Sequence, residues 1–272
     1  MIHFSKYTGC GNDFILIDHR IPVFPLAASE SKALIERLCH RQNGIGADGI
    51  IFLEEGIEFK MRIFNRDGSE AEMCGNGLRC FAAYILELGF IKKSYTVHVH
   101  NQSLRVDFVG DEVKAEMENP KDLELDQTIE IDGKVLTYHI INTGVPHLII
   151  FTSSLDIPVD ELGSKLRHHP RFFPKGVNAN FVMKFSDQEL NVRTFERGVE
   201  AETLACGTGA TASALIAHLK WQMEPPIRVK TKSSNKLEIN FKKNNLGVIS
   251  HVTQTGPAMK LFHGSFDIRG YI

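Results

Sequence analysis

The sequence predicts an α+β protein of two pseudo-symmetric domains, each a curved mixed sheet or barrel around one central helix. Three observations support this fold class. Several motifs recur about half a chain apart, a cysteine motif in each half leads into an apolar helix, and short segments of alternating polarity surround both helices. An α+β architecture places each buried helix against the sheet formed by those segments.

A cysteine motif occurs twice in the chain. "CGNGLRC" occupies residues 74–80 and "CGTGATA" residues 206–212, so that Cys74 and Cys206 lie 132 residues apart in a chain of 272. Other segments recur in the same order: "TG" at 8–9 and 143–144, "GIGADGII" at 44–51 and "GVNANFVM" at 176–183, "FNRDGSEAEMC" at 64–74 and "FERGVEAETLAC" at 195–206, and "SLRVDF" at 103–108 and "KLEINF" at 236–241. One match could be chance, but five in one order indicate a duplication.

The duplication predicts two domains. We expect the N-terminal domain to comprise residues 1–117 together with about 260–272, and the C-terminal domain residues 118–259. The proline motifs "ENP" at 118–120 and "TGP" at 255–257 close the two halves, because proline favours the exit from a strand.

Each half combines strand patterns with one buried helix. Segments such as "KMRIFN" at 60–65, "YTVHVH" at 95–100 and "LNVRTF" at 190–195 alternate in polarity, as half-buried strands do. "LRCFAAYILELG" at 78–89 and "ATASALIAHLK" at 210–220 are apolar on nearly every face, and Gly89 is expected to end the first helix. A helix that is apolar all round is buried, so each sheet should curve around its helix.

Composition excludes several classes of function. The net charge of −2 provides no basic surface for nucleic acid, and no apolar run is long enough to span a bilayer. The first residues lack the layout of a signal peptide, so we expect a cytoplasmic protein that binds neither nucleic acid nor membrane. "HVH" at 98–100 and "HH" at 168–169 have no carboxylate or cysteine at ligand spacing, and no metal is expected.

The paired cysteines indicate acid–base chemistry. Each stands at the start of a buried helix, where free N–H groups and the helix dipole favour a thiolate and can hold an anion such as a carboxylate. Two domains that face each other across a cleft would present both cysteines to one ligand. Inversion of a stereocentre needs a base on one face of a carbon and an acid on the other, which a pair of cysteines supplies. No motif for a nucleotide, pyridoxal phosphate or another cofactor is present, so we expect none.

The remaining cysteines call for a structural interpretation. Free cysteine is among the most buried residue types, and we expect Cys39 and Cys80 to be inert core residues. Cys10 is less clear because "TGCGND" resembles a loop, but no helix follows to activate its thiol. The five cysteines contain no CxxC pair, which argues against a disulfide framework, a zinc ribbon and a thiol redox enzyme.

The chain resembles the diaminopimelate epimerases over nearly its whole length. The segments that carry the resemblance are "GCGNDF" (9–14), "GIGADG" (44–49), "FNRDGSEAEMCGNGLRCFA" (64–82), "GVPH" (144–147), "GVNANF" (176–181), "RTFERG" (193–198) and "ETLACGTGA" (202–210). The resemblance implies two pseudo-symmetric halves with the active site between them. It also implies interconversion of LL- and meso-2,6-diaminopimelate, a small amino acid, without a cofactor, in the synthesis of lysine and peptidoglycan precursors. The sequence leaves monomer and homodimer open.

The resemblance also implies roles for individual residues. Cys74 and Cys206 match the catalytic acid and base, while Gly75, Asn76, Gly207 and Thr208 match the helix-start groups that hold the carboxylate at the reacting centre. The polar residues that match contacts around the substrate, several of them at its far end, are Asn12, Asn65, Asn178, Glu196 and Arg197. His147 and Glu196 match residues that tune the pKa values of the two cysteines.

Two departures from the family pattern concern the far end of the substrate. Val145 in "GVPH" stands where the family has asparagine, and "GVEAET" is one residue longer than the family's loop beside Glu196 and Arg197. We therefore expect the reaction type to be kept and the selectivity to be relaxed toward other amino acids. The alternatives are a proline or hydroxyproline racemase of the same architecture, disfavoured by Asn76 and by Leu204 and Ala205, and a non-catalytic amino-acid-binding protein, disfavoured by the paired cysteines.

Overall fold

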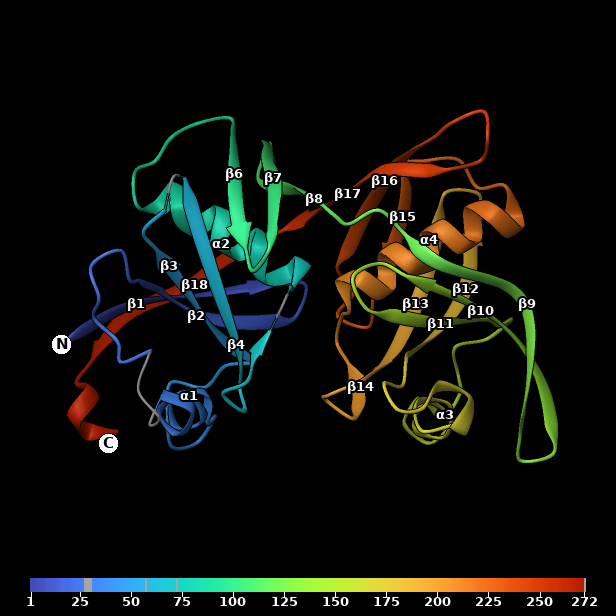
Figure 1. Ribbon diagram of the computed structural model, residues 1–272, viewed down its shortest axis with the longest axis horizontal. Coiled ribbons are helices and arrows are strands. Elements are labelled where there is room, and N and C mark those ends of the chain that lie inside the picture. Colours follow the sequence, from blue (N-terminus) through green and yellow to red (C-terminus); the bar gives the residue numbers. More distant parts are fainter. Residues whose placement is uncertain (27–30, 57, 72, 272) are drawn as a thin grey trace. The chain divides into compact units, whose positions relative to one another are not determined.

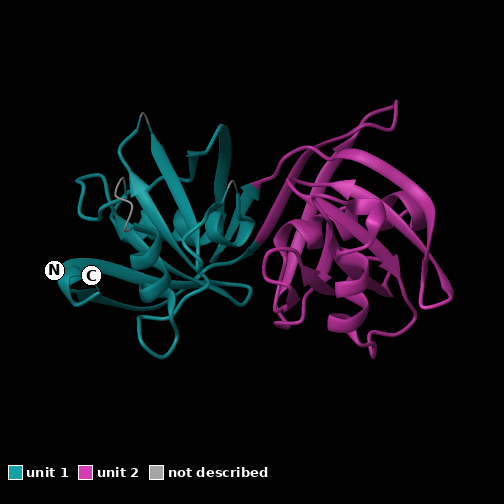
Figure 2. Cartoon of the chain, turned by 60° about the horizontal axis from the view of Figure 1, so that its bottom comes forward, with its two compact units in different colours: residues 1–115, 256–272 teal, residues 116–255 magenta. Residues whose placement is uncertain are grey.

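The computed structural model describes residues 1–26, 31–56, 58–71 and 73–271. The chain divides into two compact units, one formed by residues 1–115 with 256–272 and the other by residues 116–255 (Figure 2). The units therefore change over at 115/116 and at 255/256. The domain limits expected from the sequence, at 117/118 and at about 260, stay a prediction.

The first unit is a mixed sheet with a helix on each face (Figure 1). Its elements are β1 (Ile2–Gly9), β2 (Asn12–Asp18), α1 (Ser31–Cys39), β3 (Gly49–Glu54), β4 (Phe59–Asn65), β5 (Glu70–Ala71), α2 (Gly75–Glu87), β6 (Ser94–Val99), β7 (Gln102–Val109), β8 (Glu112–Glu116), β18 (Met259–Phe266) and the 3₁₀ turn η2 (Ile268–Gly270). The strands pair in the order β18-β1-β2-β3-β4-β6-β7-β8, with β5 added to β4. The β2–β3 and β4–β6 pairs are parallel.

The second unit repeats this arrangement. Its elements are β9 (Lys121–Ile131), β10 (Lys134–Asn142), β11 (Pro146–Phe151), α3 (Val159–Arg167), the 3₁₀ turn η1 (Pro170–Phe172), β12 (Asn178–Ser186), β13 (Glu189–Glu196), β14 (Ala201–Thr203), α4 (Gly207–Trp221), β15 (Ile227–Lys230), β16 (Lys236–Lys243) and β17 (Ile249–Pro257). The strand order is β9-β10-β11-β12-β13-β15-β16-β17, with β14 added to β13. The β11–β12 and β13–β15 pairs are parallel.

The two units have the same order of strands and the same placement of helices, although the edge strand β18 comes last in the chain and its counterpart β9 begins the second unit. A short helix joins the strands of the first parallel pair in each (α1 and α3), and a long helix precedes the second parallel strand (α2 and α4). The predicted fold class, a duplicated α+β protein with a mixed sheet and a central helix in each half, is confirmed. The short helices α1 and α3 were not predicted, because the apolar patterns in the sequence indicated only the helix after each cysteine.

The long helices owe their burial to their composition. Leu78, Phe81 and Ile85 of α2 pack into one core with residues of the surrounding strands, such as Leu16 and Val97. In α4 every residue from Gly209 to His218 is buried, and it is apolar on all sides as expected. Gly89, with φ +89°, follows the last turn of α2 in the left-handed conformation that glycine adopts most readily.

Strand register corrects one detail of the sequence repeat. Phe64 of β4 pairs with Glu70 of β5, and Phe195 of β13 pairs with Glu202 of β14. Glu202, rather than Glu200 of the matched "EAE" triplets, is therefore the counterpart of Glu70. The extra residue of the second half lies in the turn at 197–200, before this glutamate. This turn overlaps "GVEAET", where the sequence also has its extra residue, so only the pairing of the two triplets is wrong.

Register also shifts the alignment of "GIGADGII" with "GVNANFVM". Ile50 pairs with Phe64 and Ala179 with Phe195, so Ile50 corresponds to Ala179, three residues away from the match made by letters alone. In the same register the parallel pairs Phe14 with Gly49 and His147 with Asn178 are equivalent. His147 is thus the counterpart of Phe14, and Val145 that of Asn12. Thr8 pairs with Asp13 as Asn142 pairs with Pro146, so Thr8 corresponds to Asn142, and the two "TG" motifs are one residue out of register.

Candidate active site

Cys74 caps the start of α2. Its backbone is extended (φ −149°, ψ 112°), and its Sγ accepts a hydrogen bond from the Gly77 N–H at 3.4 Å. Its carbonyl oxygen accepts from the Leu78 N–H at 2.8 Å, the first bond of the helix. The sulfur therefore lies among the N–H groups of the helix start, where a negative charge is favoured. Gly75, whose N–H belongs to the same group, is the first residue of the helix.

The Asn76 side chain orders this helix start. Asn76 is 2% exposed, and its Nδ2 donates to the Asn12 Oδ1 at 2.6 Å. Its Oδ1 accepts from the buried Arg79 guanidinium, which also donates to the Gly75 carbonyl at 3.3 Å. Both polar atoms of this amide are thus engaged within the unit. Asn12 and Asn76, both predicted from the sequence, are brought together, and Arg79 is a partner that sequence reasoning missed.

A chain of charged groups holds Asn12 in turn. The Asn12 Nδ2 donates to Asp48 at 3.3 Å, and Arg41 bridges Asp48 and Asp13, both at 2.7 Å. Lys6, which is 3% exposed, pairs with Asp13 at 2.6 Å. Burial tends to raise the pKa of Asp13, but hydrogen bonds from Arg41 and Lys6 outweigh it and hold the pKa below its usual range. Asp48 lies in the quoted "GIGADG" segment and was not singled out there.

Asn65 occupies the end of β4. Its Nδ2 donates to the Ser69 Oγ at 3.0 Å, and its N–H donates to the Ser69 carbonyl at 2.8 Å. It faces Gly49 across the β3–β4 ladder. Its described hydrogen bonds therefore tie it to the turn before Cys74, at the end of the sheet where β2 and β3 begin.

Cys206 is the N-cap residue of α4, the position that Cys74 has in α2, but its sulfur does not make the capping bond that Cys74 makes. It is 7% exposed and extended (φ −117°, ψ 109°), and its Sγ lies 3.5 Å from the Thr208 Oγ1. Its carbonyl accepts from the Ala210 N–H at 2.9 Å. The carbonyl of Thr208 accepts from the Thr143 hydroxyl at 2.9 Å, which ties the helix start to the loop before β11. Gly207 likewise accepts, through its carbonyl, a bond of 2.7 Å from the Gln254 side chain.

His147 lies fully buried at the start of β11. Its Nδ1 contacts the Asn180 Nδ2 at 3.2 Å, and Asn180 also accepts from the Thr194 hydroxyl at 2.9 Å. Burial lowers the pKa of His147 to about 3, and the positive charge of Arg197 contributes in the same direction. The imidazole is therefore neutral at ordinary pH. Asn180 was not singled out from "GVNANF", although it is the residue of that segment that contacts His147.

Asn178, Glu196 and Arg197 gather at one end of β12 and β13. The Asn178 Oδ1 accepts from the Arg197 N–H at 2.7 Å, and the Arg197 guanidinium donates to the Lys175 carbonyl at 3.2 Å. Glu196 is half-buried and ends β13. Val145 is half-buried too, in the turn before β11, and its carbonyl accepts from the Thr143 N–H at 3.3 Å. The structure thus collects the predicted residues of each half at one end of its sheet, beside the cysteine that begins its long helix.

The other thiols belong to the core. Burial raises the pKa of Cys10, Cys39 and Cys80, in Cys39 to about 12. Cys39 and Cys80 are inert core residues, as expected. Cys10 is 2% exposed, with its Sγ 3.5 Å from Arg79, and it therefore serves packing as well.

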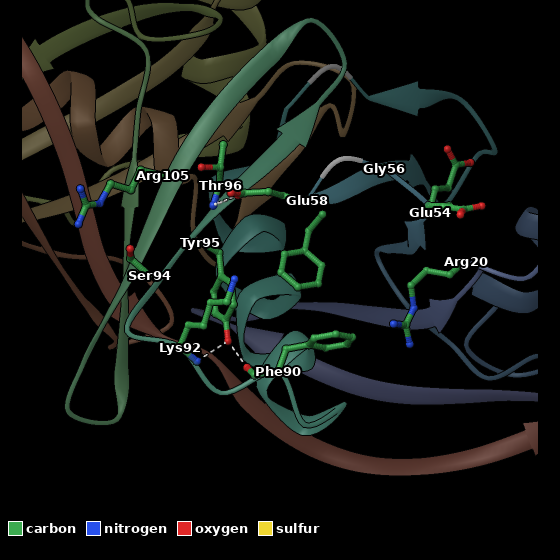
Figure 3. A pocket seen from close by; sticks show the side chains of 12 residues that line it. Arg20, Glu54, Gly56, Glu58, Phe90, Lys92, Ser94, Tyr95, Thr96 and Arg105 are labelled. Carbon is green, nitrogen blue, oxygen red and sulfur yellow. Dashed lines mark hydrogen bonds between the residues drawn. The ribbon is translucent and has the colours of Figure 1, made fainter.

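Neither the histidine pairs nor the hollow shown in Figure 3 forms part of the predicted site. Within the described ranges no three His, Cys, Asp or Glu side chains gather as metal ligands would. A hollow of about 430 Å³ in the first unit is lined by residues such as Arg20, Glu58 and Tyr95 (Figure 3), and the predicted site residues are not among those that line it. In this hollow the Tyr95 hydroxyl accepts a hydrogen bond from the Lys92 N–H and donates one to the Phe90 carbonyl. Of the helices in the described part of the chain, none has the length and apolar character that crossing a bilayer requires.

Solved structures share this duplicated fold. A PhzF-family phenazine biosynthesis protein of Bacillus anthracis aligns with a TM-score of 0.75 at 13% identity, covering 97% of this chain and 98% of that one. A hydroxyproline epimerase of Agrobacterium vitis aligns with a TM-score of 0.71 at 13% identity, covering 97% and 91%. The class is therefore that of two-repeat α+β proteins, here with a cysteine at the start of each central helix.

Sequence comparison identifies the family. The model of the family described as diaminopimelate epimerase matches residues 4–122 and 139–261. The diaminopimelate epimerase of Aquifex aeolicus is 37% identical, with 97% of each chain covered, and that of Methanothrix thermoacetophila is 41% identical, with 88% of this chain and 89% of the other covered. The chain belongs to the diaminopimelate epimerase family, and it is an isomerase.

Proposed function

We propose that the enzyme interconverts LL- and meso-2,6-diaminopimelate by proton transfer between Cys74 and Cys206, one acting as base and the other as acid. The observation that carries this proposal is the repeated geometry of the two thiols. Each is the N-cap residue of a buried helix, at an equivalent place in one of two units with the same order of strands. A pair of thiols on opposite faces of one α-carbon accounts for a duplication that a single nucleophile would not need.

The substrate carboxylate next to the reacting carbon would bind to the N–H groups at the two helix starts, at Gly75 and Asn76 and at Gly207 and Thr208. Such donors also stabilise the negative charge that develops on the carboxylate when the α-proton leaves. The absence of acidic residues from the first turn of either helix supports this role, because a carboxylate there would repel the substrate.

The far end of the substrate carries a second ammonium and a second carboxylate. Arg197 can bind that carboxylate, and Glu196 can accept from the ammonium. Asn178 supports the pair by accepting from the Arg197 N–H, while Asn12 and Asn65 would contact the substrate from the first unit. His147 would influence the cysteines as a neutral group rather than as a charge, with Glu196 as the second residue that tunes them.

A homodimer and a cytoplasmic location belong to the same proposal. The strand β18 is paired on one side by β1, and Met259, Leu261 and Phe262 on it are exposed, which suits the edge-to-edge contact of two copies. The chemistry requires reduced thiols, and the described cysteines form no disulfide. Because a reducing compartment keeps thiols free, we place the enzyme in the cytoplasm.

Deuterium exchange at the α-carbon tests the mechanism. Wild-type enzyme in D₂O with either LL- or meso-diaminopimelate should incorporate deuterium as the stereocentre inverts. Cys74→Ala and Cys206→Ala should each lose inversion, and Cys39→Ala, at a thiol in the core, serves as the control. Full inversion in either catalytic variant would overturn the two-base assignment. Proline and hydroxyproline complete the panel, and faster turnover of either would favour the racemase alternative.

A further inference from the structure

The two long helices begin on chemically different supports. A Cβ on Gly77 would lie 2.9 Å from the Ile63 Cδ1 and 3.1 Å from the Ile51 Cδ1, so the first turn of α2 rests on two methyl groups. A Cβ on Gly209 would lie 2.3 Å from the Asn180 Oδ1 and 3.3 Å from the Cys206 Sγ. The first turn of α4 therefore rests on a polar amide.

The strand register shows that these supports occupy equivalent places. Ile51 faces Ile63 across β3 and β4, as Asn180 faces Thr194 across β12 and β13. His147 of β11 and its counterpart Phe14 of β2 complete two equivalent sets of three side chains. These are Phe14, Ile51 and Ile63 in the first unit, and His147, Asn180 and Thr194 in the second. All six side chains are at most 4% exposed. Burying three polar groups where apolar ones serve in the other half costs free energy unless they are hydrogen-bonded.

The hydrogen bonds of Asn180 determine the state of His147. The Asn180 Nδ2 donates to the carbonyls of Leu148 at 3.1 Å and Asn178 at 3.3 Å, and its Oδ1 accepts from the Thr194 hydroxyl. These three partners fix which end of the amide faces His147, and it is the NH₂ end. An amide NH₂ cannot accept a hydrogen bond, so a proton on Nδ1 of His147 would have no acceptor there, and the proton of the neutral ring resides on Nε2. That Nε2 is buried and has no hydrogen-bond partner among the described residues.

We propose that Asn180 is a positioning residue that holds His147 with its proton on Nε2, so that the second unit offers a neutral hydrogen-bond donor at the place where the first unit has Phe14. Burying an Nε2–H without a hydrogen-bond partner costs free energy, and an anion brought by the substrate or formed on a catalytic thiol would accept that hydrogen bond. The two half-sites, alike in fold, are then unlike in chemistry. This inference rests on the proposed function only for the anion that the Nε2–H would bind. The protonation state of His147 does not depend on it.

The histidine state is measurable without activity. In ¹⁵N spectra of histidine-labelled wild-type enzyme, the His147 signals, assigned by their loss in His147→Gln, should show an unprotonated Nδ1 and a protonated Nε2. Asn180→Asp replaces the donor with an acceptor and should place a proton on Nδ1. Ile51→Ala, a cavity at the equivalent place in the first unit, should leave these signals unchanged. A protonated Nδ1 in the wild-type enzyme would overturn the proposal, whether or not the Asp variant folds.

Kinetics supply the second readout. Asn180→Ala should lower kcat by about tenfold to a hundredfold, the range typical of the hydrogen-bond partners of metal-binding histidines, with a smaller change in KM. Unchanged kcat together with an altered histidine spectrum would show that the tautomer does not matter for turnover, and would overturn the proposal on its functional side. Failure of deuterium exchange in the wild-type enzyme would refute the proposed function instead and leave the spectrum as it is.

Discussion

The Asn180 Oδ1 lies where a methyl group on Gly209 would have to be, 2.3 Å from the position of its Cβ. Because hydrogen bonds to His147, Thr194 and two carbonyls hold that amide, it cannot swing aside freely. We expect Gly209→Ala to lower the free energy of unfolding by about 1–3 kcal/mol, as overpacking of a core typically does. Urea unfolding of the purified variant measures this.

Gly77→Ala is the matched control for that substitution. Its new Cβ would meet the ends of two isoleucine side chains, which can rotate away, and alanine gains helix propensity over glycine. The change in unfolding free energy should therefore be near zero in Gly77→Ala. Equal losses in the two variants would show that the polar support under α4 is no more rigid than the apolar one under α2.

The buried His147 should make stability depend on pH. Its pKa is about 3 in the folded enzyme, against the ordinary value of 6.5 in the unfolded chain, so below 6.5 the unfolded chain binds a proton that the folded one refuses. Its contribution is full above 6.5 and is lost as the pH falls toward 3. Between about pH 7.5 and about pH 5, the wild type should lose about 2 kcal/mol more unfolding free energy than His147→Gln. Parallel pH profiles of the two proteins would contradict a buried neutral histidine.

Mild oxidation should join the two proposed catalytic thiols. If Cys74 and Cys206 converge on one carbon, hydrogen peroxide should accept two electrons from the pair, forming a Cys74–Cys206 disulfide and two molecules of water. Activity should be lost with the thiols and return when a thiol reductant cleaves the disulfide. Peptide mass spectrometry detects the cross-link. Cys10→Ser is the control and should oxidise in the same way, because burial raises the pKa of Cys10 and keeps that thiol protonated. Reversible inactivation without this cross-linked peptide would count against convergence of the thiols.

Activity should survive the removal of metals and cofactors. Enzyme dialysed against a chelator, without added pyridoxal phosphate, is expected to keep its full rate, since two thiols and the helix N–H groups supply the acid, the base and the charge stabilisation. The measurement is the rate of LL- to meso-diaminopimelate conversion before and after dialysis, with a mock-dialysed sample for comparison. A rate restored only by a metal ion or by pyridoxal phosphate would refute the mechanism.

Val145 should widen the range of substrates. A site rejects a shorter ligand when buried polar partners are left unpaired, and valine removes one such partner at the place that corresponds to Asn12 in the first unit. We expect slow racemisation of L-glutamate by the wild-type enzyme and less of it in Val145→Asn, followed by circular dichroism. Absence of this side activity in the wild type, or no change on restoring asparagine, would show that another residue has taken over the contact.

The sequence alone contained the duplication, the two central helices and the pair of cysteines. These features follow from local patterns. A helix with apolar side chains on nearly every face, such as residues 210–220, is buried in any fold, and the cysteine before Gly-x-Gly recurs together with the segments around it. The family resemblance supplied the candidate residues around them. None of this required knowledge of which strands pair.

Tertiary structure alone decided the register of the two halves and the partners of the site residues. Strand pairing is a long-range choice that depends on turn length and packing, so identical letters such as the two "EAE" triplets can be aligned while their strands are not. Arg79, Asp48 and Asn180 were missed because the role of a buried or half-buried polar residue is recognised from its hydrogen-bond partners, which lie 2 to 69 residues away for these three. The apolar contact under α2 and the polar contact under α4 can be compared only once strand pairing places Ile51 and Asn180 at equivalent positions. Both side chains are buried there, so the polar one has to be hydrogen-bonded, and this need depends on the tertiary structure.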